Sequence, residues 1–401
     1  KKRRGRKTME LTRKQEEGLR IAIDRYNHNE PYTVIAGYAG TGKSTLINFI
    51  IAALEVNPED EVAYITFTGK ASEVLREKGC PNAMTAHKLL YYSKQMPNGK
   101  FFYRPRPSLG KDYKVIVVDE VSMLPKDMWD LLLTHGIYVI ACGDPFQIPP
   151  INKNQDNGIL NNPHIFLDEV MRQAKESNII RLSMDIREGK KINPFKGNDT
   201  QVFNKKDLCN GMYFWADQIL VSTNKSRHDI NSYIRDDLGR GFEPEINDKV
   251  ICLRNCWDTL SEKQHDPLIN GSIGVINNMH MESIDYIAEG KIINVPILVT
   301  DLTTSTDEYK NLNIDYTALT TGEKFFTPKQ EYIIRKNKQN PELPIEFNFG
   351  YAITGHRAQG SQWNKVLVLE ESFPFDKVEH ARWLYTTVTR AAEKLTLILK
   401  N

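Results

Sequence analysis

The sequence has no uninterrupted apolar run close to the roughly 20 residues that a membrane-spanning helix requires. Its basic N-terminal cluster is not followed by the apolar segment that a secretory leader contains. It also has no repeat of the solenoid type and no low-complexity tract. These absences argue against a membrane protein, a secreted precursor and a repeat protein, and we expect a globular protein of the cytoplasm.

Cysteine is scarce, with five residues in a chain of 401. An odd number does not make the even set that a disulfide framework needs. Cys252 and Cys256 lie close together in the sequence, but no second pair of cysteines or histidines has the spacing of a zinc site. We therefore expect reduced thiols, as is usual in the cytoplasm.

A strong excess of either charge is also lacking, because 53 Lys and Arg face 51 Asp and Glu. Six of the basic residues lie within positions 1–7, and without them 47 basic residues face 51 acidic ones, a net charge of −4. The body is thus not a generally basic protein that coats nucleic acid, and any such contact must come from a local groove. We expect residues 1–9 to form a disordered tail, with a phosphate-gripping arm as the alternative.

The most informative stretch is a glycine-rich segment between an apolar run and a helical pattern. It has the spacing Gly-x-x-x-x-Gly-Lys-Ser and so predicts a P-loop, whose glycines let backbone N–H groups turn toward phosphate oxygens. The lysine would reach the β- and γ-phosphates, and the serine hydroxyl would bind Mg²⁺. The alternative is a glycine-rich turn with a solvated lysine. The expected ATP contacts are Gly37, Gly40, Thr41, Gly42, Lys43, Ser44 and Thr45.

An acid pair, Asp119 and Glu120, ends a run of β-branched residues typical of a buried parallel strand. Asp119 is expected to hold Mg²⁺ through water, and Glu120 to orient and deprotonate the attacking water. The alternative is an acid pair that only stabilises a helix N-terminus. Gln147, in a turn after the next strand, is a candidate sensor of the γ-phosphate, although alone it would be an ordinary loop amide.

Gln15 has two interpretations. It stands at the capping-box position of a helix whose N-cap is Thr12. Its carboxamide could also pair with both a donor and an acceptor on adenine. The residues alone favour neither.

Residues 91–107 interrupt the alternation of strands and helices. Asn98-Gly99 between two strand-like runs predicts a hairpin. The aromatics Phe101, Phe102 and Tyr103 on it either pack against the parent domain or contact something flat, such as a base.

The length predicts two to four domains. After about residue 176, buried strands at 219–222, 365–369 and 395–399 indicate a second α/β unit, interrupted by an insert with the alternation of a small β-barrel. Residues 301–343 show no readable pattern. The predicted fold is α/β with two parallel-sheet domains. Its expected parts are a tail at 1–9, a first domain at 10–175 with the hairpin at 91–110, a second domain at 176–245 and 346–401, and the insert at 246–345.

Together these segments resemble superfamily 1 DNA helicases, and within them the RecD/Dda-like 5′–3′ group, superfamily 1B. The resemblance covers nearly the whole chain beyond the tail, and one departure is Arg357, where the family usually has lysine. The similar segments are 37–44, 68–71, 85–87, 117–123, 143–150, 172–173, 351–361 and 384–390.

The resemblance assigns partners to residues that local chemistry leaves open. Arg172 and Arg390 would reach from the second RecA-like domain onto the γ-phosphate as arginine fingers, and Gly360 would line the nucleotide side of the cleft. The hairpin resembles a strand-separating pin, and the insert an SH3-like module. Capping and turn stabilisation are the alternatives for most of the residues expected on the DNA path, which are Thr68, Lys70, Thr85, His87, Phe101, Phe102, Asn224, Thr354 and His356.

The sequence therefore predicts an ATP- and Mg²⁺-dependent DNA helicase that moves 5′ to 3′ on single-stranded DNA and splits duplex at the pin. Replication or recombination proteins are candidate partners. The alternatives are an RNA helicase of the same superfamily and a nucleic-acid-stimulated ATPase that remodels without unwinding.

Overall fold

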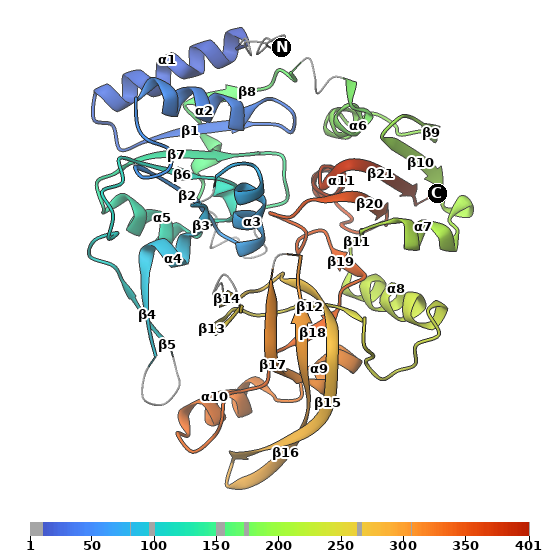
Figure 1. The fold of residues 1–401 in the computed structure, drawn as a ribbon. Coiled ribbons are helices and arrows are strands. Elements are labelled where there is room, and N and C mark those ends of the chain that lie inside the picture. Colours follow the sequence, from blue (N-terminus) through green and yellow to red (C-terminus); the bar gives the residue numbers. More distant parts are fainter. Residues whose placement is uncertain are drawn as a thin grey trace, which may run out of the picture.

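The computed structural model describes residues 11–80, 82–95, 101–149, 157–171, 176–262, 267–305 and 307–400. Figure 1 shows two α/β units side by side and a third, β-rich part beneath them. The chain builds the first unit, enters the second, leaves it for the β-rich insert and returns to finish the second.

The first unit is built on a parallel sheet with the strand order β3-β2-β6-β7-β1-β8. Its central strands are apolar and buried on both faces, as parallel strands between two helical layers must be. The strands are β1 (Tyr32–Gly37), β2 (Val62–Thr66), β3 (Met84–Thr85), β6 (Val115–Val118), β7 (Tyr138–Gly143) and β8 (Ile165–Leu167).

Helices cover both faces of this sheet because successive strand residues point to opposite sides. Ile35 packs with Leu46 and Ile50 on one face, whereas Val34 packs with Leu132 on the other. The first face carries α1 (Arg13–Asn27) and α2 (Lys43–Ala53), and the second α4 (Ala86–Leu90) and α5 (Lys126–Leu133). The helix α3 (Gly69–Glu77) follows β2, and the short η1 (Val121–Met123) follows β6.

A hairpin projects from the first unit (Figure 1). Its strands β4 (Tyr91–Gln95) and β5 (Phe101–Pro105) pair antiparallel, with Tyr91 opposite Pro105. The predicted hairpin is thus present in the backbone. Its expected turn at Asn98-Gly99 lies outside the described residues.

The second unit has the strand order β19-β11-β20-β21-β10-β9, parallel except for the edge strand β9. Residues from both sides of the insert build it, since β19, β20 and β21 come after the insert and the other three strands before it. The strands are β9 (Phe195–Lys196), β10 (Thr200–Asn204), β11 (Gln218–Val221), β19 (Ala352–Thr354), β20 (Trp363–Leu369) and β21 (Ala391–Leu399).

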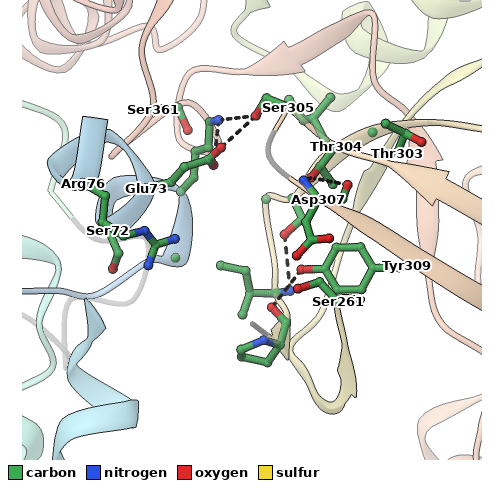
Figure 2. Close-up of a pocket in the computed structure, with 18 of the residues that line it drawn as sticks. Ser72, Glu73, Arg76, Ser261, Thr303, Thr304, Ser305, Asp307, Tyr309 and Ser361 are labelled. Atoms are coloured by element: carbon green, nitrogen blue, oxygen red, sulfur yellow. Dashed lines mark hydrogen bonds and ion pairs between the residues drawn. The ribbon is translucent and has the colours of Figure 1, made fainter. Parts of the chain in front are cut away.

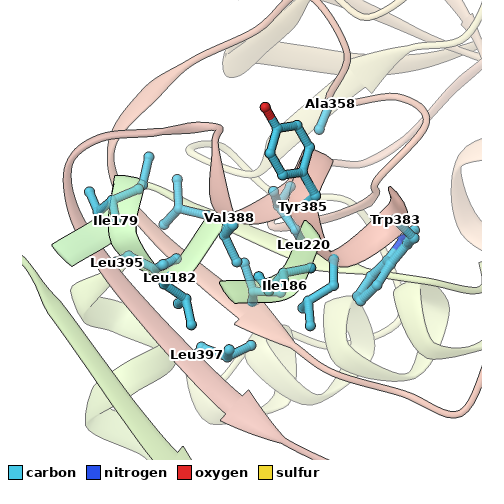
Figure 3. Close-up of a cluster of buried hydrophobic side chains, with 14 of the residues drawn as sticks. Ile179, Leu182, Ile186, Leu220, Ala358, Trp383, Tyr385, Val388, Leu395 and Leu397 are labelled. Carbon is cyan, nitrogen blue, oxygen red and sulfur yellow. The ribbon is translucent and has the colours of Figure 1, made fainter. Parts of the chain in front are cut away.

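The core of the second unit also has two layers. Figure 3 shows the layer in which Ile179, Leu182 and Ile186 pack with Trp383, Tyr385 and Val388 against the sheet. These side chains come from α6 (Asn178–Arg187) and α11 (Lys377–Val388). The other face carries α7 (Asn210–Trp215) and α8 (Asn224–Asp237), with η5 (Lys205–Asp207) between β10 and α7.

The insert is an antiparallel sheet of order β17-β16-β15-β12-β18 with a small second pair, β13 and β14. The long strands β15 and β16 form the ribbon at the bottom of Figure 1. The elements are β12 (Lys249–Cys252), β13 (Cys256–Leu260), β14 (Pro267–Leu268), β15 (Ile273–Ala288), β16 (Lys291–Thr303), β17 (Glu308–Asp315), α9 (Tyr316–Thr321), α10 (Pro328–Lys336) and β18 (Phe347–Phe349).

The predicted pair of parallel-sheet α/β units is confirmed, and so is a β-rich insert. The SH3-like barrel stays a prediction. The stretch 301–343, which shows no readable pattern in the sequence, holds the end of β16, the strand β17 and the helices α9 and α10. Among the described helices, none has the length and apolarity that a bilayer crossing requires.

Candidate nucleotide and nucleic-acid site

The glycine-rich loop connects β1 to α2 at the edge of the first sheet. Gly40 and Gly42 have φ values of 75° and 78°, in the left-handed region that side chains disfavour. The loop therefore makes its turn at the two positions where glycine is needed. The Lys43 ammonium folds over it and donates to the carbonyl oxygens of Gly37 at 2.7 Å and Tyr38 at 3.0 Å.

Gln15 is fully buried against this loop. Its amide nitrogen donates to the carbonyl oxygens of Thr41 and Gly42, both at 3.3 Å. Its amide oxygen accepts from Thr12 N at 3.0 Å and completes the capping box of α1. The cap is therefore present and also fixes α1 to the loop, and adenine recognition by Gln15 stays a prediction.

The acid pair follows β6, next to the loop. Asp119 Oδ1 accepts from Glu120 N at 3.0 Å and from the Cys142 thiol at 3.1 Å. Glu120 has φ of 50°, and its Oε2 is buried with no hydrogen-bond partner among the described residues. Burial raises the pKa of Glu120 above its ordinary value, while the Arg390 guanidinium opposes that shift.

These residues fit a nucleoside triphosphate with Mg²⁺. A carboxylate oxygen buried without a donor is costly unless a water or ligand meets it, and Glu120 Oε2 is such an oxygen. The exposed Ser44 hydroxyl at the start of α2 and the Asp119 carboxylate are oxygen donors of the kind Mg²⁺ prefers. In the described ranges, no group of three or more His, Cys, Asp or Glu gathers in the manner of a metal site.

The second unit contributes a buried arginine to this acid pair. Arg390 lies just after α11, is 4% exposed, and has its Nη1 3.4 Å from Glu120 Oε1. Its Nε donates to the Thr386 carbonyl at 3.1 Å, which fixes the side chain on its own helix. The two residues are far apart in the sequence, yet the fold brings them into one ion pair.

Gly360 lies against the same carboxylate. A Cβ at this position would lie 2.8 Å from Thr68 Oγ1 and 3.1 Å from Glu120 Oε2, and φ is 73°. Only glycine fits there without a shift of its neighbours. The structure therefore brings Gly360, Glu120, Arg390 and Thr68 together.

The loop after β7 joins the two units. The Ile148 N–H donates to Thr386 Oγ1 at 2.9 Å, and the Ile148 carbonyl accepts from Gln359 Nε2 at 2.5 Å. Asp144 Oδ2 accepts from the Tyr385 hydroxyl at 2.6 Å. Gln147 lies within this loop, half-buried, with its N–H 3.4 Å from the Asp144 carbonyl.

Tyr385 is a residue whose role the sequence does not reveal. Its hydroxyl accepts from the N–H of Ala39 in the P-loop at 2.8 Å while donating to Asp144. One hydroxyl of the second unit thus connects the P-loop and the loop after β7. A tyrosine within a buried helical pattern normally indicates only a core residue, so the sequence does not predict a contact with the P-loop.

Arg187 is a second residue whose role the sequence does not reveal. It lies at the end of α6, and its guanidinium lies 3.7 Å from the ring centre of Tyr38 in the P-loop, a cation–π contact. Its Nη1 is buried without a hydrogen-bond partner among the described residues. The predicted finger Arg172 lies outside the described residues, although the preceding residue, Met171, donates from N to the Gly40 carbonyl at 3.0 Å.

Two of the predicted DNA contacts are helix caps. Thr68 accepts from Ala71 N and caps α3, and Thr85 accepts from Lys88 N and caps α4. Asn224 is the exposed first residue of α8, whose cap is the neighbouring Thr223. Capping is therefore observed for Thr68 and Thr85, and their contact with DNA stays a prediction.

The two predicted histidines are partly buried, and burial lowers the pKa of each. His87 lies between the rings of Phe67 and Tyr91, with centroids 5.7 and 5.9 Å away. His356 follows Thr354 in the turn after β19. The side chains of Phe101 and Phe102 lie outside the description.

Lys70 faces a cavity of about 500 Å³ between α3 and the insert. Its ammonium lies 2.8 Å from Glu73 Oε2 and 3.2 Å from Ser305 Oγ, and Ser305 also donates to Glu73 Oε1 at 2.8 Å. Figure 2 shows Glu73 and Ser305 facing one another across the top of this cavity. The insert is thus tied to the first unit at a predicted DNA contact.

Comparison with known sequences matches two domain families to segments that form the two α/β units. The AAA domain family matches residues 10–202, and the UvrD-like helicase C-terminal domain family matches residues 349–398. The chain is 26% identical to the ATP-dependent RecD2 DNA helicase of Deinococcus radiodurans, and the match covers 90% of this chain. It is also 26% identical to the ATP-dependent DNA helicase dda of Enterobacteria phage T4 over 61% of its length. These matches support placing the chain with the RecD/Dda/Pif1-like helicases of superfamily 1B.

The match spans 46% of RecD2 and 61% of Dda, so this chain corresponds to only part of those relatives. Among solved structures, the Pif1 helicase of Candida albicans aligns over 98% of this chain and 95% of its own, with 18% identity and a TM-score of 0.49. The two family matches include the P-loop, the acid pair and Arg390, whereas most of the insert lies outside both.

Proposed function

We propose that this protein is an ATP-dependent DNA helicase that moves 5′ to 3′ along single-stranded DNA and separates duplex. The observation that carries the proposal is the Arg390–Glu120 pair, in which the second unit reaches the acid beside the P-loop of the first. An ATPase site shared between two units converts nucleotide chemistry into relative movement of those units. The names of RecD2 and Dda supply the activity and the substrate.

The first unit would bind the triphosphate. The N–H groups of 40–45 and the start of α2 offer donors to phosphate oxygens, and Lys43 would exchange the carbonyls of Gly37 and Tyr38 for the β- and γ-phosphates. Ser44 and Asp119 would hold Mg²⁺, which when bound supplies positive charge to the phosphate oxygens. Gln15, packed beneath the loop, and Thr45 complete the proposed nucleotide contacts.

Glu120 would act as the base. Its buried Oε2 would accept a proton from the water whose oxygen attacks the γ-phosphorus, while the bond from that phosphorus to the bridging oxygen breaks. Arg390 would turn from Glu120 to the charge developing on the phosphoryl oxygens, with Arg172 as the second finger. Gly360 leaves room for this exchange.

The loop after β7 would report the state of the nucleotide. Gln147 would bond the γ-phosphate, and the same loop holds the second unit through Asp144–Tyr385 and Ile148–Thr386. Loss of the γ-phosphate would weaken this seam and let the units separate. Alternate closing and opening, with alternating grip on the strand, would produce directed movement.

The DNA path would cross both units. Its contacts would come from the ends of β2, β3, β11 and β19 and from the hairpin, which would act as the pin. We also propose the domain limits 10–175, 176–245 with 346–401, and 246–345, the last as an SH3-like module. The residues proposed to contact the strand are Thr68, Lys70, Thr85, His87, Phe101, Phe102, Asn224, Thr354 and His356.

The test is unwinding of duplexes that carry either a 5′ or a 3′ single-stranded overhang, with ATP and Mg²⁺. Wild type should unwind the 5′-tailed duplex only, and Lys43→Ala should bind DNA but neither hydrolyse ATP nor unwind. Lys329→Ala, a change of an exposed lysine on the insert, is the control and should behave as wild type. Unwinding by Lys43→Ala, or ATP hydrolysis without any strand separation by wild type, would contradict the proposal.

A further inference from the structure

The second sheet presents more than the predicted DNA contacts along one edge. Because its inner strands are parallel, their carboxyl ends all lie on that edge. Asn224 follows β11, Glu370 follows β20, Lys400 follows β21 and Lys205 follows β10. The edge therefore continues from a proposed DNA contact past three further strands (Figure 1).

The far part of this edge is a basic groove of about 1130 Å³. We call it the lysine groove, and the lysines that line it are Lys190, Lys191, Lys205, Lys206, Lys377 and Lys400. Lys190 is paired with Asp185 at 2.9 Å and Glu188 at 2.7 Å. The other five are exposed and form no ion pair within the described part of the chain.

Two acids near the groove, Glu370 and Asp376, have hydrogen-bond partners of their own. Glu370 accepts from Lys400 N at 3.1 Å and lies 3.5 Å from His380 Nε2. Asp376 caps α11 by accepting from Val378 N at 2.8 Å and Glu379 N at 3.0 Å. The groove thus keeps a positive field, although the body of the protein is acidic overall.

Two exposed phenylalanines lie in the loop that connects β20 to α11. Phe373 is 42% exposed and Phe375 is 82% exposed, and their rings meet edge to face with centroids 5.6 Å apart. Their loop begins at Glu371, which accepts from Ser222 N at 2.6 Å beside Asn224, and it ends at Lys377 in the groove. Large exposed aromatic rings next to lysines are the combination that stacks bases and holds phosphates of a single strand.

We propose that single-stranded DNA continues from Asn224 over Phe373 and Phe375 into the lysine groove. This inference rests on the proposed helicase function and extends its DNA site. Three strand spacings separate β11 from β10, about 14 Å. A stacked strand advances about 3.4 Å per nucleotide, so the extension takes roughly four nucleotides.

The experiment measures binding of fluorescent oligothymidylates whose length rises in steps of about four nucleotides, at two salt concentrations. For wild type, affinity should rise when the strand becomes long enough to reach the groove. The groove variant, in which Lys205, Lys206, Lys377 and Lys400 are changed to Gln, should lose that gain. For the long strand, the slope of its log binding constant against log salt concentration should be smaller in magnitude by about 3. The Phe373→Ala/Phe375→Ala variant should lose roughly tenfold on the long strand.

A matched control removes the same charge elsewhere. Lys291, Lys329, Lys336 and Lys338 are exposed on the insert, and their change to Gln should keep the length-dependent gain. The same gain in the groove variant as in wild type would overturn this inference while leaving the helicase proposal standing. Failure of wild type to bind even the short strand would instead contradict the helicase proposal.

The groove could also suit an acidic peptide, which a poly-glutamate competitor tests. If poly-glutamate binds wild type, does not bind the groove variant and leaves long-strand affinity unchanged, the groove takes an acidic segment and the DNA extension is wrong. Competition between poly-glutamate and the long strand only, with no effect on the short one, supports the extension.

Discussion

Two seams hold this molecule together, and they differ in kind. The seam between the two parallel-sheet units is buried and polar, and it centres on the P-loop through Tyr385 and on the acid pair through Arg390. The seam between α3 and the insert surrounds a cavity, and its polar contacts include the partly exposed group of Lys70, Glu73 and Ser305.

The difference follows from the physical cost of each contact. Buried polar groups must be paired, so the first seam has one well-defined closed arrangement. A state in which only some of its hydrogen bonds form has a high free energy. Exposed ion pairs contribute little and are screened by salt. In the proposed mechanism, the first seam would therefore sense the nucleotide and the second would yield when DNA enters.

The largest expected effect comes from breaking the first seam at Arg390. Arg390→Ala should lower kcat for DNA-stimulated ATP hydrolysis by roughly 10³-fold or more, the range for loss of an arginine finger. Arg390→Lys keeps the positive charge but lacks the planar, two-pronged donor geometry of guanidinium, so its kcat should lie between those of Arg390→Ala and wild type. Steady-state ATPase assays measure both, with Arg335→Ala on the insert as the control. A kcat within threefold, or about 0.6 kcal/mol, of wild type would remove Arg390 from the site.

The pH profile of the same variants tests Glu120. Burial raises the pKa of this carboxyl and Arg390 opposes the shift, so loss of the guanidinium charge should raise that pKa further. The base is active only when ionised, so a higher pKa moves the acidic limb of the pH profile of kcat to higher pH. We expect this shift in Arg390→Gln but not in Arg390→Lys, which keeps the positive charge. An unmoved limb in Arg390→Gln would mean that another group sets it.

The same shift affects stability with a definite sign. Because the pKa of Glu120 is raised on folding, the folded protein binds more protons than the unfolded chain between the ordinary value of 4.5 and the raised one. Its contribution to the free energy of unfolding should therefore fall as pH rises through that window. Glu120→Gln should remove this pH dependence, which thermal unfolding at several pH values would show.

A smaller effect is expected from Tyr385→Phe, which keeps the ring and removes one hydroxyl. Ala39 N–H and Asp144 Oδ2 would each lose a buried partner, a cost of roughly 1–3 kcal/mol. The melting temperature should fall by a few degrees, and ATP hydrolysis should respond less to DNA because the seam closes less firmly. Tyr113→Phe, another buried tyrosine, is the control. An unchanged response to DNA would show that Tyr385 only packs.

The features that could be predicted from the sequence are local ones. A strand, a glycine-rich turn and a helix follow one another in the chain, so the position of Lys43 beside Gly37 can be read directly. The acid pair at the end of a β-branched run is similar. Tyr385 and Arg187 could not be found this way, because their partners Ala39 and Tyr38 belong to the other unit and no periodicity encodes that contact.

The stretch 301–343 shows a second limit. In β17 the residue Asn311 has φ of 51°, and the pairing with β16 shifts its register between Thr300 and Leu302. Such an irregularity breaks the alternation of apolar and polar residues on which strand prediction depends. The long neighbouring strands β15 and β16 are partly recognisable because their alternation survives over more residues.

The smallest expected effect lies at the second seam. Glu73→Gln removes the charge that holds the Lys70 ammonium, and should change the free energy of unfolding by less than about 1 kcal/mol. The released ammonium could then meet a DNA phosphate, so affinity for a single strand should rise by about twofold to fivefold, with a salt slope steeper by about 0.7. Fluorescence anisotropy at two salt concentrations measures this, with Glu289→Gln on the insert as the control. Weaker binding by Glu73→Gln would mean that the closed contact of α3 with Ser305 forms part of the DNA path, and the contrast between a fixed seam and a yielding one would then be wrong.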